Sequence, residues 1–128
     1  MADGPLQVEL VAADRTVWSG QATMVIARTV EGDVGVLKDH APLLSLLADA
    51  VVEIDTGDET VVAAVDGGFI SVAQNRVSIL SERALLADEI DVKAVESELE
   101  EARASEDDDA EDRVRRAEVQ LRAAEKAS

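Results

Sequence analysis

The N-terminal two-thirds of the chain shows the two-residue period of half-buried β-strands. Leu6, Val8 and Leu10 alternate with the polar residues Gln7 and Glu9, which places the apolar side chains on one face. Five later segments are rich in valine and isoleucine and have strand length: 23–28, 51–55, 60–65, 69–73 and 76–80. Turn-forming residues separate the last four segments, at 56–58, 66–68 and 74–75. Many short strands joined by turns rich in Gly and Asp predict an antiparallel sandwich or barrel.

From about residue 84 the pattern becomes helical, and Gly and Pro no longer occur. Asp91 is placed to cap a first helix, and a second helix is expected after the acidic run 106–109. Apolar positions in both helices follow heptad-like spacings of three and four residues, which form a narrow stripe. These seam positions are Val92, Val95, Leu99 and Ala102, then Ala110, Val114, Ala117, Leu121 and Ala124. A short connection between two such helices predicts an antiparallel hairpin.

The chain is therefore predicted to be a mainly β protein of the α+β class with two parts. Residues 1–85 form an antiparallel β-sandwich, and residues 86–128 form an antiparallel two-helix hairpin. The helix seam is thin and rich in alanine, so we expect a weakly held hairpin that can move and can be removed without unfolding the sandwich. Acid-to-base pairs four residues apart support the second helix: Asp109–Arg113, Glu111–Arg115, Asp112–Arg116 and Glu118–Arg122.

The charge of the chain limits its partners. There are 28 acidic and 12 basic residues among 128, a formal net charge of −16. Nucleic acids and anionic lipid headgroups need a basic surface, so neither is an expected partner. No segment approaches the ~20 apolar residues of a membrane-spanning helix, and residues 1–5 do not resemble a signal peptide. We therefore expect a soluble cytosolic chain that meets a membrane only through a partner.

No catalytic or metal site is expected from the reactive residues. The chain has no cysteine and a single histidine, His40, near which no nucleophile and orienting group form a set. The acidic run 106–109 lacks the spacing and the glycine of a calcium loop and is expected to be a solvated connection. The pairs Gly32/Gly35 and Gly67/Gly68 match no phosphate-binding motif, and we interpret them as turn glycines.

Three ordered motifs resemble a known family. The segment 31–36 alternates acidic, glycine and apolar residues, and His40-Ala41-Pro42-Leu43-Leu44 follows it closely. A second motif is Asp66-Gly67-Gly68-Phe69-Ile70 with the strand 75–80 after it, and a third is an early strand followed by Trp18-Ser19-Gly20. Together with the two-helix tail, these motifs resemble the epsilon subunits of bacterial F-type ATP synthases over nearly the whole chain.

The resemblance implies a non-catalytic rotor part at the foot of the central stalk, between the gamma subunit and the membrane c-ring. It implies a peripheral position at the cytoplasmic face of the cell membrane and a role in coupling proton flow to ATP synthesis. The residues that match the c-ring contact are Glu31, Gly32 and Asp33. Those that correspond to the gamma contact are Ala12, His40, Ser45, Asp66 and Ser71.

The resemblance also implies a regulatory hairpin that extends toward the alpha and beta catalytic subunits and inhibits ATP hydrolysis. Its basic residues Arg113, Arg115, Arg116 and Arg122 are expected to contact those acidic subunits. Some family members bind ATP on the hairpin through an Ile-Asp pair followed by arginines. Ile90 and Asp91 match that pair, but Ala94 and Glu101 stand at arginine positions, so no cofactor is expected.

Two alternatives remain at this stage. The same two-part fold could be a stand-alone adaptor that binds an unrelated protein. A small hydrolase would instead use His40 together with Asp39 or Asp33.

Overall fold

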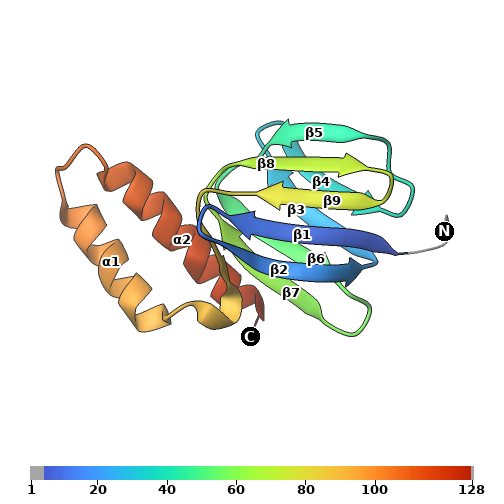
Figure 1. Ribbon diagram of the computed structural model, residues 1–128. Helices are drawn as coiled ribbons and strands as arrows, with labels where there is room; N and C mark the ends of the chain where they lie inside the picture. Colours follow the sequence, from blue (N-terminus) through green and yellow to red (C-terminus); the bar gives the residue numbers. More distant parts are fainter. Residues whose placement is uncertain (1–4, 128) are drawn as a thin grey trace.

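The chain folds into a two-layer β-sandwich with a helical hairpin packed on one layer (Figure 1). The computed structural model describes residues 5–127, so the prediction about a signal peptide in residues 1–5 concerns residues that, apart from Pro5, lie outside this range. Sheet 1 has the order β2 (Arg15–Ala22), β1 (Leu6–Ala12), β9 (Arg76–Leu80), β8 (Phe69–Ala73) and β5 (Leu43–Leu46). Sheet 2 has the order β10 (Ala84–Leu86), β7 (Thr60–Val65), β6 (Ala50–Asp55), β3 (Met24–Thr29) and β4 (Gly32–Leu37).

The core lies between the two sheets, where the predicted alternation is confirmed. Leu6, Val8 and Leu10 are each 0% exposed, while Glu9 between them faces outward. Sheet 2 contributes Val25, Val36 and Ile54 from the opposite side, and each of these is also 0% exposed. Burying one such side chain contributes about 1.5–3 kcal/mol, so this apolar layer is the main source of stability in the sandwich.

The predicted sandwich is confirmed, and all six predicted strands are present. One strand pair differs from the antiparallel expectation, because β1 and β9 run parallel with Val8 opposite Val77. Four strands were not predicted, namely β2, β4, β5 and β10. β2 lies at a sheet edge, and only two of its eight residues, Val17 and Ala22, are buried. The predicted boundary between residues 85 and 86 falls within β10.

The interpretation of Gly35 as a turn glycine is wrong. Gly35 lies inside β4 opposite Ile26 and has no positive φ, since the turn closes earlier at Gly32 with φ 127°. Gly67 and Gly68 do form a turn, with φ values of 64° and 104°.

The hairpin consists of α1 (Val92–Ala104) and α2 (Ala110–Ala127), preceded by the short 3-10 helix η1 (Ala87–Glu89). Asp91 caps α1 as predicted, because its carboxylate accepts a hydrogen bond from the N–H of Ala94 at 3.2 Å. The acidic run forms the connection between the helices. Of the predicted seam, Leu99, Ala102, Ala110 and Ala117 are buried, whereas Val92 is 42% exposed.

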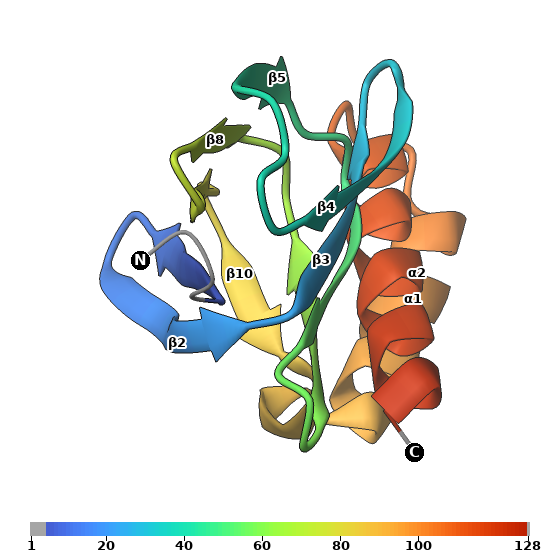
Figure 2. The ribbon, with the colours of Figure 1, turned by 90° about the vertical axis from the view of Figure 1, so that its right-hand side faces the viewer.

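A second buried face on α2 was not predicted. Val119 and Ala123 are 2% and 0% exposed, and they pack against Val62 and Ala64 of β7. Figures 1 and 2 show the consequence: α2 lies between α1 and the sandwich, on the side of sheet 2. Within residues 5–127 no helix has the length and apolar character that crossing a membrane requires.

Candidate docking surfaces and the hairpin junction

The β3–β4 turn is held rigid by its own side chains. The hydroxyl of Thr29 accepts a hydrogen bond from the N–H of Glu31 at 3.1 Å and donates one to the carbonyl of Gly32 at 2.9 Å. Arg28 forms an ion pair with Asp33 at 3.1 Å across the turn. Glu31 is exposed and has no ion pair within the part of the chain that the structure describes. The turn therefore presents one free carboxylate, that of Glu31, at its tip.

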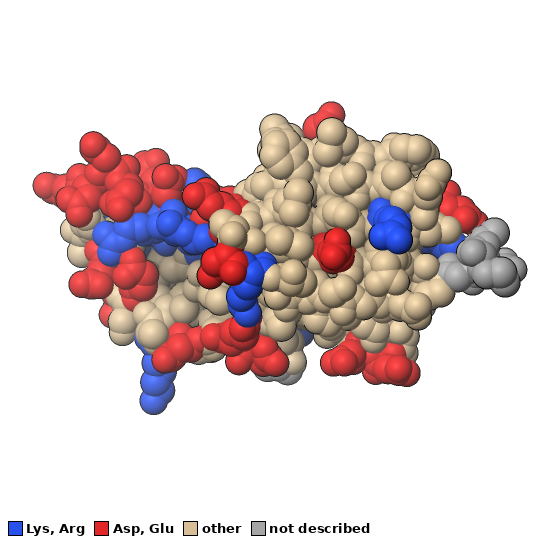
Figure 3. Space-filling model, viewed as in Figure 1, with Lys and Arg blue, Asp and Glu red and all other residues tan. Residues whose placement is uncertain are grey.

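The outer face of sheet 1 carries a row of exposed apolar side chains. Leu46 lies opposite Phe69, and Phe69 lies opposite Leu80, so the three side chains cross neighbouring strands in register. They are 50%, 48% and 50% exposed, and the nearby Leu44 is 74% exposed. Figure 3 shows this face as mostly uncharged, in contrast to the acidic surface of the hairpin. We call these four residues the apolar row.

The structure does not bring the five residues predicted for gamma binding together. Ser71 lies beside the apolar row, opposite Leu44. Ala12 and Ser45 are only 5% and 8% exposed and point into the core, so neither side chain is part of a surface. Asp66 lies at the other end of the sandwich, at the hairpin junction. These five residues come from different strands and loops, and only the tertiary structure decides which of them share a surface.

His40 lies in the loop before β5 and meets no catalytic partner among residues 5–127. Its Nδ1 donates a hydrogen bond to the carbonyl of Ala41 at 2.6 Å. Asp39 is instead engaged with Asn75, whose side-chain oxygen accepts the N–H of Asp39 at 2.6 Å. Asp33 is paired with Arg28. Neither carboxylate orients the imidazole, so the hydrolase alternative has no site in this structure.

The face of α2 that meets the sandwich combines apolar and basic residues. Arg115, Val119, Ala123 and Lys126 follow a spacing of four, four and three, which places them on one side of a helix. We call them the docking stripe. Arg115 binds Asp49 at 2.6 Å and Lys126 binds Glu53 at 3.3 Å, so an ion pair lies on each side of the apolar contact. This stripe could be found in the sequence as a second helical period beside the seam.

The predicted pairing of the hairpin arginines differs from the structure. Arg113 binds Glu98 of α1 at 2.7 Å, and this ion pair lowers the pKa of Glu98 and raises that of Arg113. Arg115 binds Asp49 and Asp112, not the predicted Glu111. Arg122 is exposed. The pairs predicted for Arg113 and Arg115 are wrong because acidic residues of α1 and of the sandwich come within reach only in the folded chain.

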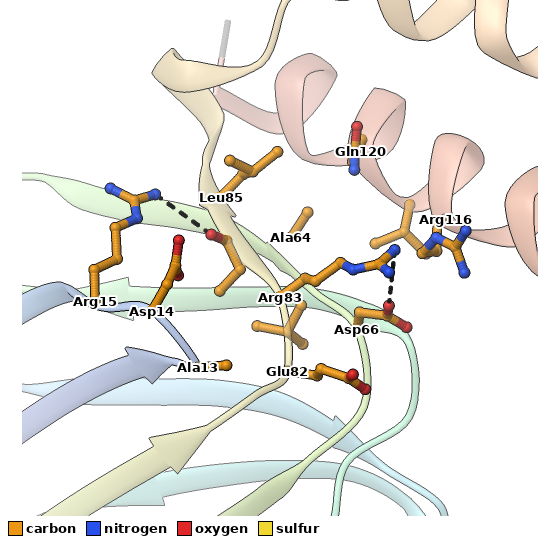
Figure 4. Close-up of a pocket in the computed structure, with 13 residues that line it drawn as sticks. Ala13, Asp14, Arg15, Ala64, Asp66, Glu82, Arg83, Leu85, Arg116 and Gln120 are labelled. Carbon is orange, nitrogen blue, oxygen red and sulfur yellow. Dashed lines mark hydrogen bonds and ion pairs between the residues drawn. The ribbon is translucent and has the colours of Figure 1, made fainter.

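Arg116 lines a cavity of about 380 Å³ between α2 and the sandwich (Figure 4). Arg83 and Arg116 approach Asp66 there, and Arg83 lies 4.0 Å from its carboxylate. Burial is the main cause that raises the pKa of Asp66, and its contact with Asp49 raises it further. The cavity is a junction between the two parts of the chain, because residues of the sandwich and of α2 line it together.

Comparisons with known proteins place this architecture in a family. The family model for the β-sandwich domain of the ATP synthase delta/epsilon chain matches residues 5–87. The ATP synthase epsilon chain of Streptomyces avermitilis is 60% identical over 119 residues, covering 92% of this chain and 94% of that protein. That of Corynebacterium urealyticum is 43% identical over 124 residues, 95% of each chain.

Solved structures agree with these relatives. A chain in the cryo-EM structure of the Euglena gracilis mitochondrial ATP synthase (OSCP/F1/c-ring) has 27% identity and a TM-score of 0.72, covering 95% of this chain and 78% of that chain. A chain from the central stalk/c-ring structure of the Tetrahymena thermophila mitochondrial ATP synthase, at 14% identity and a TM-score of 0.61, has the same fold. The protein therefore belongs to the delta/epsilon-chain family of ATP synthase subunits, the family that its three ordered motifs resemble.

Proposed function

We propose that this non-catalytic central-stalk subunit docks on the gamma subunit through the outer face of sheet 1. The observation that carries the proposal is the apolar row. A chain with a net charge of −16 keeps Leu44, Leu46, Phe69 and Leu80 exposed on one nearly uncharged face. Exposed apolar patches of this kind mark protein interfaces, because water contact with them is unfavourable until a partner covers them.

The proposed c-ring contact is the β3–β4 turn. The Thr29 hydroxyl bridges the turn, which holds Glu31 at its tip. A free carboxylate on a rigid turn suits an arginine of a partner, since carboxylate–arginine hydrogen bonds are strong and directional. Docked on gamma and on the c-ring, the subunit would turn with the rotor as a peripheral protein at the cytoplasmic face of the bacterial membrane and couple proton flow to ATP synthesis.

The proposed role of the hairpin is to inhibit ATP hydrolysis by reaching the alpha and beta subunits. Its contact with the sandwich is small, since only Val119 and Ala123 are buried against β7. A helix held by so few apolar side chains can be released at a modest free-energy cost. Once it is released, Arg115 and Arg116 would leave their sandwich partners and become available to an acidic surface, as would Arg113 if α1 and α2 separate.

We further propose that the subunit works without bound ATP. Ile90 packs against the Val119 cluster, and Asp91 caps α1, so both members of the Ile-Asp pair have structural contacts. Ala94 and Glu101, at the expected arginine positions, are exposed. Saturable binding of ATP to the purified chain, measured by calorimetry, would contradict this proposal.

Replacing two residues of the apolar row tests the docking proposal. Leu46→Ser together with Phe69→Ser should weaken binding to purified gamma subunit at least tenfold, because truncating interface side chains of this size costs more than about 1 kcal/mol each. Val92→Ser is the matched control, since Val92 is an exposed apolar residue of the hairpin. Calorimetry with unchanged affinity for the double variant would refute gamma docking by this face.

A pull-down from native membranes that recovers neither gamma nor c-ring would support a stand-alone adaptor instead.

A further inference from the structure

Two loops bring a pair of carboxyl groups together at the hairpin junction. Asp49 lies between β5 of sheet 1 and β6 of sheet 2, and Asp66 lies between β7 of sheet 2 and β8 of sheet 1. The N–H of Leu47 donates a hydrogen bond to the carbonyl of Gly68 at 2.8 Å, which ties these two crossover loops together. The carboxylate of Asp49 lies against the residue that follows Asp66, since a Cβ atom added at Gly67 would be 3.6 Å from Asp49 Oδ1. The side chains of Asp49 and Asp66 are 17% and 24% exposed, and Asp49 is one of the groups that raise the pKa of Asp66.

Helix α2 closes over this pair with basic side chains. The Nε–H of Arg115 donates to Asp49 at 2.6 Å, and the same guanidinium binds Asp112 on α2. The positive charge of Arg116 on α2 lowers the pKa of Asp66. Arg83, in the segment before β10, lies 4.0 Å from the carboxylate of Asp66. Two further charged groups lie nearby. Glu82 lines the cavity. Glu98 of α1 forms an ion pair with Arg113, and Arg113 and Arg116 both lower the pKa of Glu98.

We propose that Asp49, Asp66 and Arg115 form a proton-sensitive latch that sets how firmly α2 is held on the sandwich. Two adjacent carboxylates repel each other, so one proton shared between them is favourable. A protonated Asp66 can donate its O–H to the carboxylate of Asp49, which is also the partner of Arg115. The inference rests on the proposed movement of the hairpin, and it does not depend on the proposed contacts with gamma, the c-ring or the catalytic subunits.

The direction of the pH dependence follows from burial. Burial raises the pKa of Asp66 above its ordinary value, and the neighbouring Asp49 adds to this effect, while Arg116 and Arg83 oppose it. Release of α2 would return Asp66 to water and remove the burial. Docking therefore takes up protons. Its favourable contribution is complete below the pKa of the released state and is lost as the pH rises through the higher pKa of the docked state.

A single cysteine reports release of the hairpin even when the released form is rare. The chain has no cysteine of its own. Ala123→Cys places a thiol on the face of α2 that packs against β7, where Ala123 is 0% exposed. A dithiodipyridine reagent therefore reaches this thiol only after the hairpin is released. Its labelling rate, divided by the rate for an exposed Ala73→Cys at the same pH, measures the released fraction. Ala73 is exposed at the end of β8, far from α2.

The normalised rate should rise as the pH passes through the Asp66 pKa, tenfold for each unit by which docking shifts that pKa. Asp66→Asn keeps a neutral hydrogen-bond donor, so it should give a low rate at every pH. Asp58→Asn changes an exposed aspartate of the β6–β7 turn and should keep the pH profile of the parent chain. A flat profile in the parent chain, or the same profile in Asp66→Asn, would overturn the proton dependence.

A charge swap tests the ion pair of the latch separately. Asp49→Arg and Arg115→Asp should each raise the normalised rate severalfold, and the double variant should return it toward the parent value. If the increases caused by the two single substitutions add up in the double variant, the assigned ion pair would be overturned. If removal of the hairpin leaves ATP hydrolysis by the complex unchanged while the labelling results hold, the inhibitory function fails and the latch stands.

Discussion

At the scale of single residues, Gly68 shows how closely the sandwich is packed at its hairpin end. A Cβ atom added at Gly68 would lie 1.8 Å from the carbonyl oxygen of Leu80, and φ at this position is 104°. Both the contact with rigid backbone and the left-handed conformation exclude a larger residue. Gly35 has nothing within 4 Å of such an atom and no positive φ. The two glycines look alike in the sequence and differ only in what surrounds them.

Gly68→Ala should therefore lower the free energy of unfolding by about 3 kcal/mol or more, through backbone strain and overpacking. Gly35→Ala, the matched control, should change it by less than about 0.5 kcal/mol. Urea denaturation followed by the fluorescence of Trp18, the single tryptophan, measures both. Equal midpoints for the two variants would show that the turn relaxes to admit a side chain.

The two acidic residues of the β3–β4 turn should contribute unequally to c-ring binding. Asp33 is already paired with Arg28 at 3.1 Å, whereas Glu31 is free to meet a new cation. Glu31→Gln should weaken binding to the isolated c-ring–gamma complex about tenfold, since a charge-assisted hydrogen bond contributes about 1.5–3 kcal/mol. Asp33→Asn should have a smaller effect. Affinity is measured with the c-ring–gamma complex immobilised on a sensor surface. A larger loss of affinity for Asp33→Asn than for Glu31→Gln would show that the ion pair of Asp33 with Arg28 opens on docking.

At the scale of elements, α2 joins the two parts of the molecule because it has two contact faces. Its seam side meets α1, and its docking stripe meets β7 and the acidic residues Asp49 and Glu53. The apolar part of the stripe is short, and Val119 is its largest side chain. The strength with which the hairpin is held should therefore depend on this one residue more than on any exposed position of the helices.

Val119→Ala should reduce docking of the hairpin by about 1–2 kcal/mol, because two buried methyl groups are lost and a cavity remains. Limited proteolysis with trypsin, which cleaves after the arginines and the lysine of α2, should then remove the tail several times faster. Val92→Ala, at a 42% exposed position of α1, is the control and should leave the rate unchanged. Equal acceleration by both variants would mean that helix fraying, and not docking, limits cleavage.

At the scale of the whole molecule, the core of the sandwich is separate from the small cluster that joins the sandwich to the hairpin. The large core lies between the two sheets, and the small cluster under α2 contains four buried residues, Val62, Ala64, Val119 and Ala123. The sandwich therefore loses little buried apolar surface when the hairpin leaves. Such a division is what the proposed movement requires, with the sandwich docked while the hairpin is released.

A chain that ends after Asp88 should keep a cooperative unfolding transition and the Trp18 fluorescence of the parent chain. It should also still assemble with gamma, because the apolar row lies on the opposite sheet from the hairpin. Under the proposed inhibitory role of the hairpin, ATP hydrolysis by the reconstituted complex should rise severalfold when the helices are absent. Loss of assembly would show that the hairpin is needed for docking, and unchanged hydrolysis would remove its regulatory role.

Much of this architecture follows from the sequence alone. Alternation of Leu6, Val8 and Leu10 with polar residues predicts a half-buried strand because the side-chain period of a strand is a property of the backbone. The helix cap at Asp91 and the acidic connection are also local, and so both were predicted correctly. The ordered motifs determined the family, since they combine several local requirements in one order.

Only the tertiary structure decided which residues meet. The parallel pairing of β1 with β9, the burial of Ala12 and Ser45, and the contact of Arg115 with Asp49 all join residues far apart in the chain. A local period gives the face of an element, but it does not give the partner of that face. The sequence therefore determined six of the ten strands, both long helices and the family. The apolar row and the hairpin latch exist only because folding brings distant segments into register.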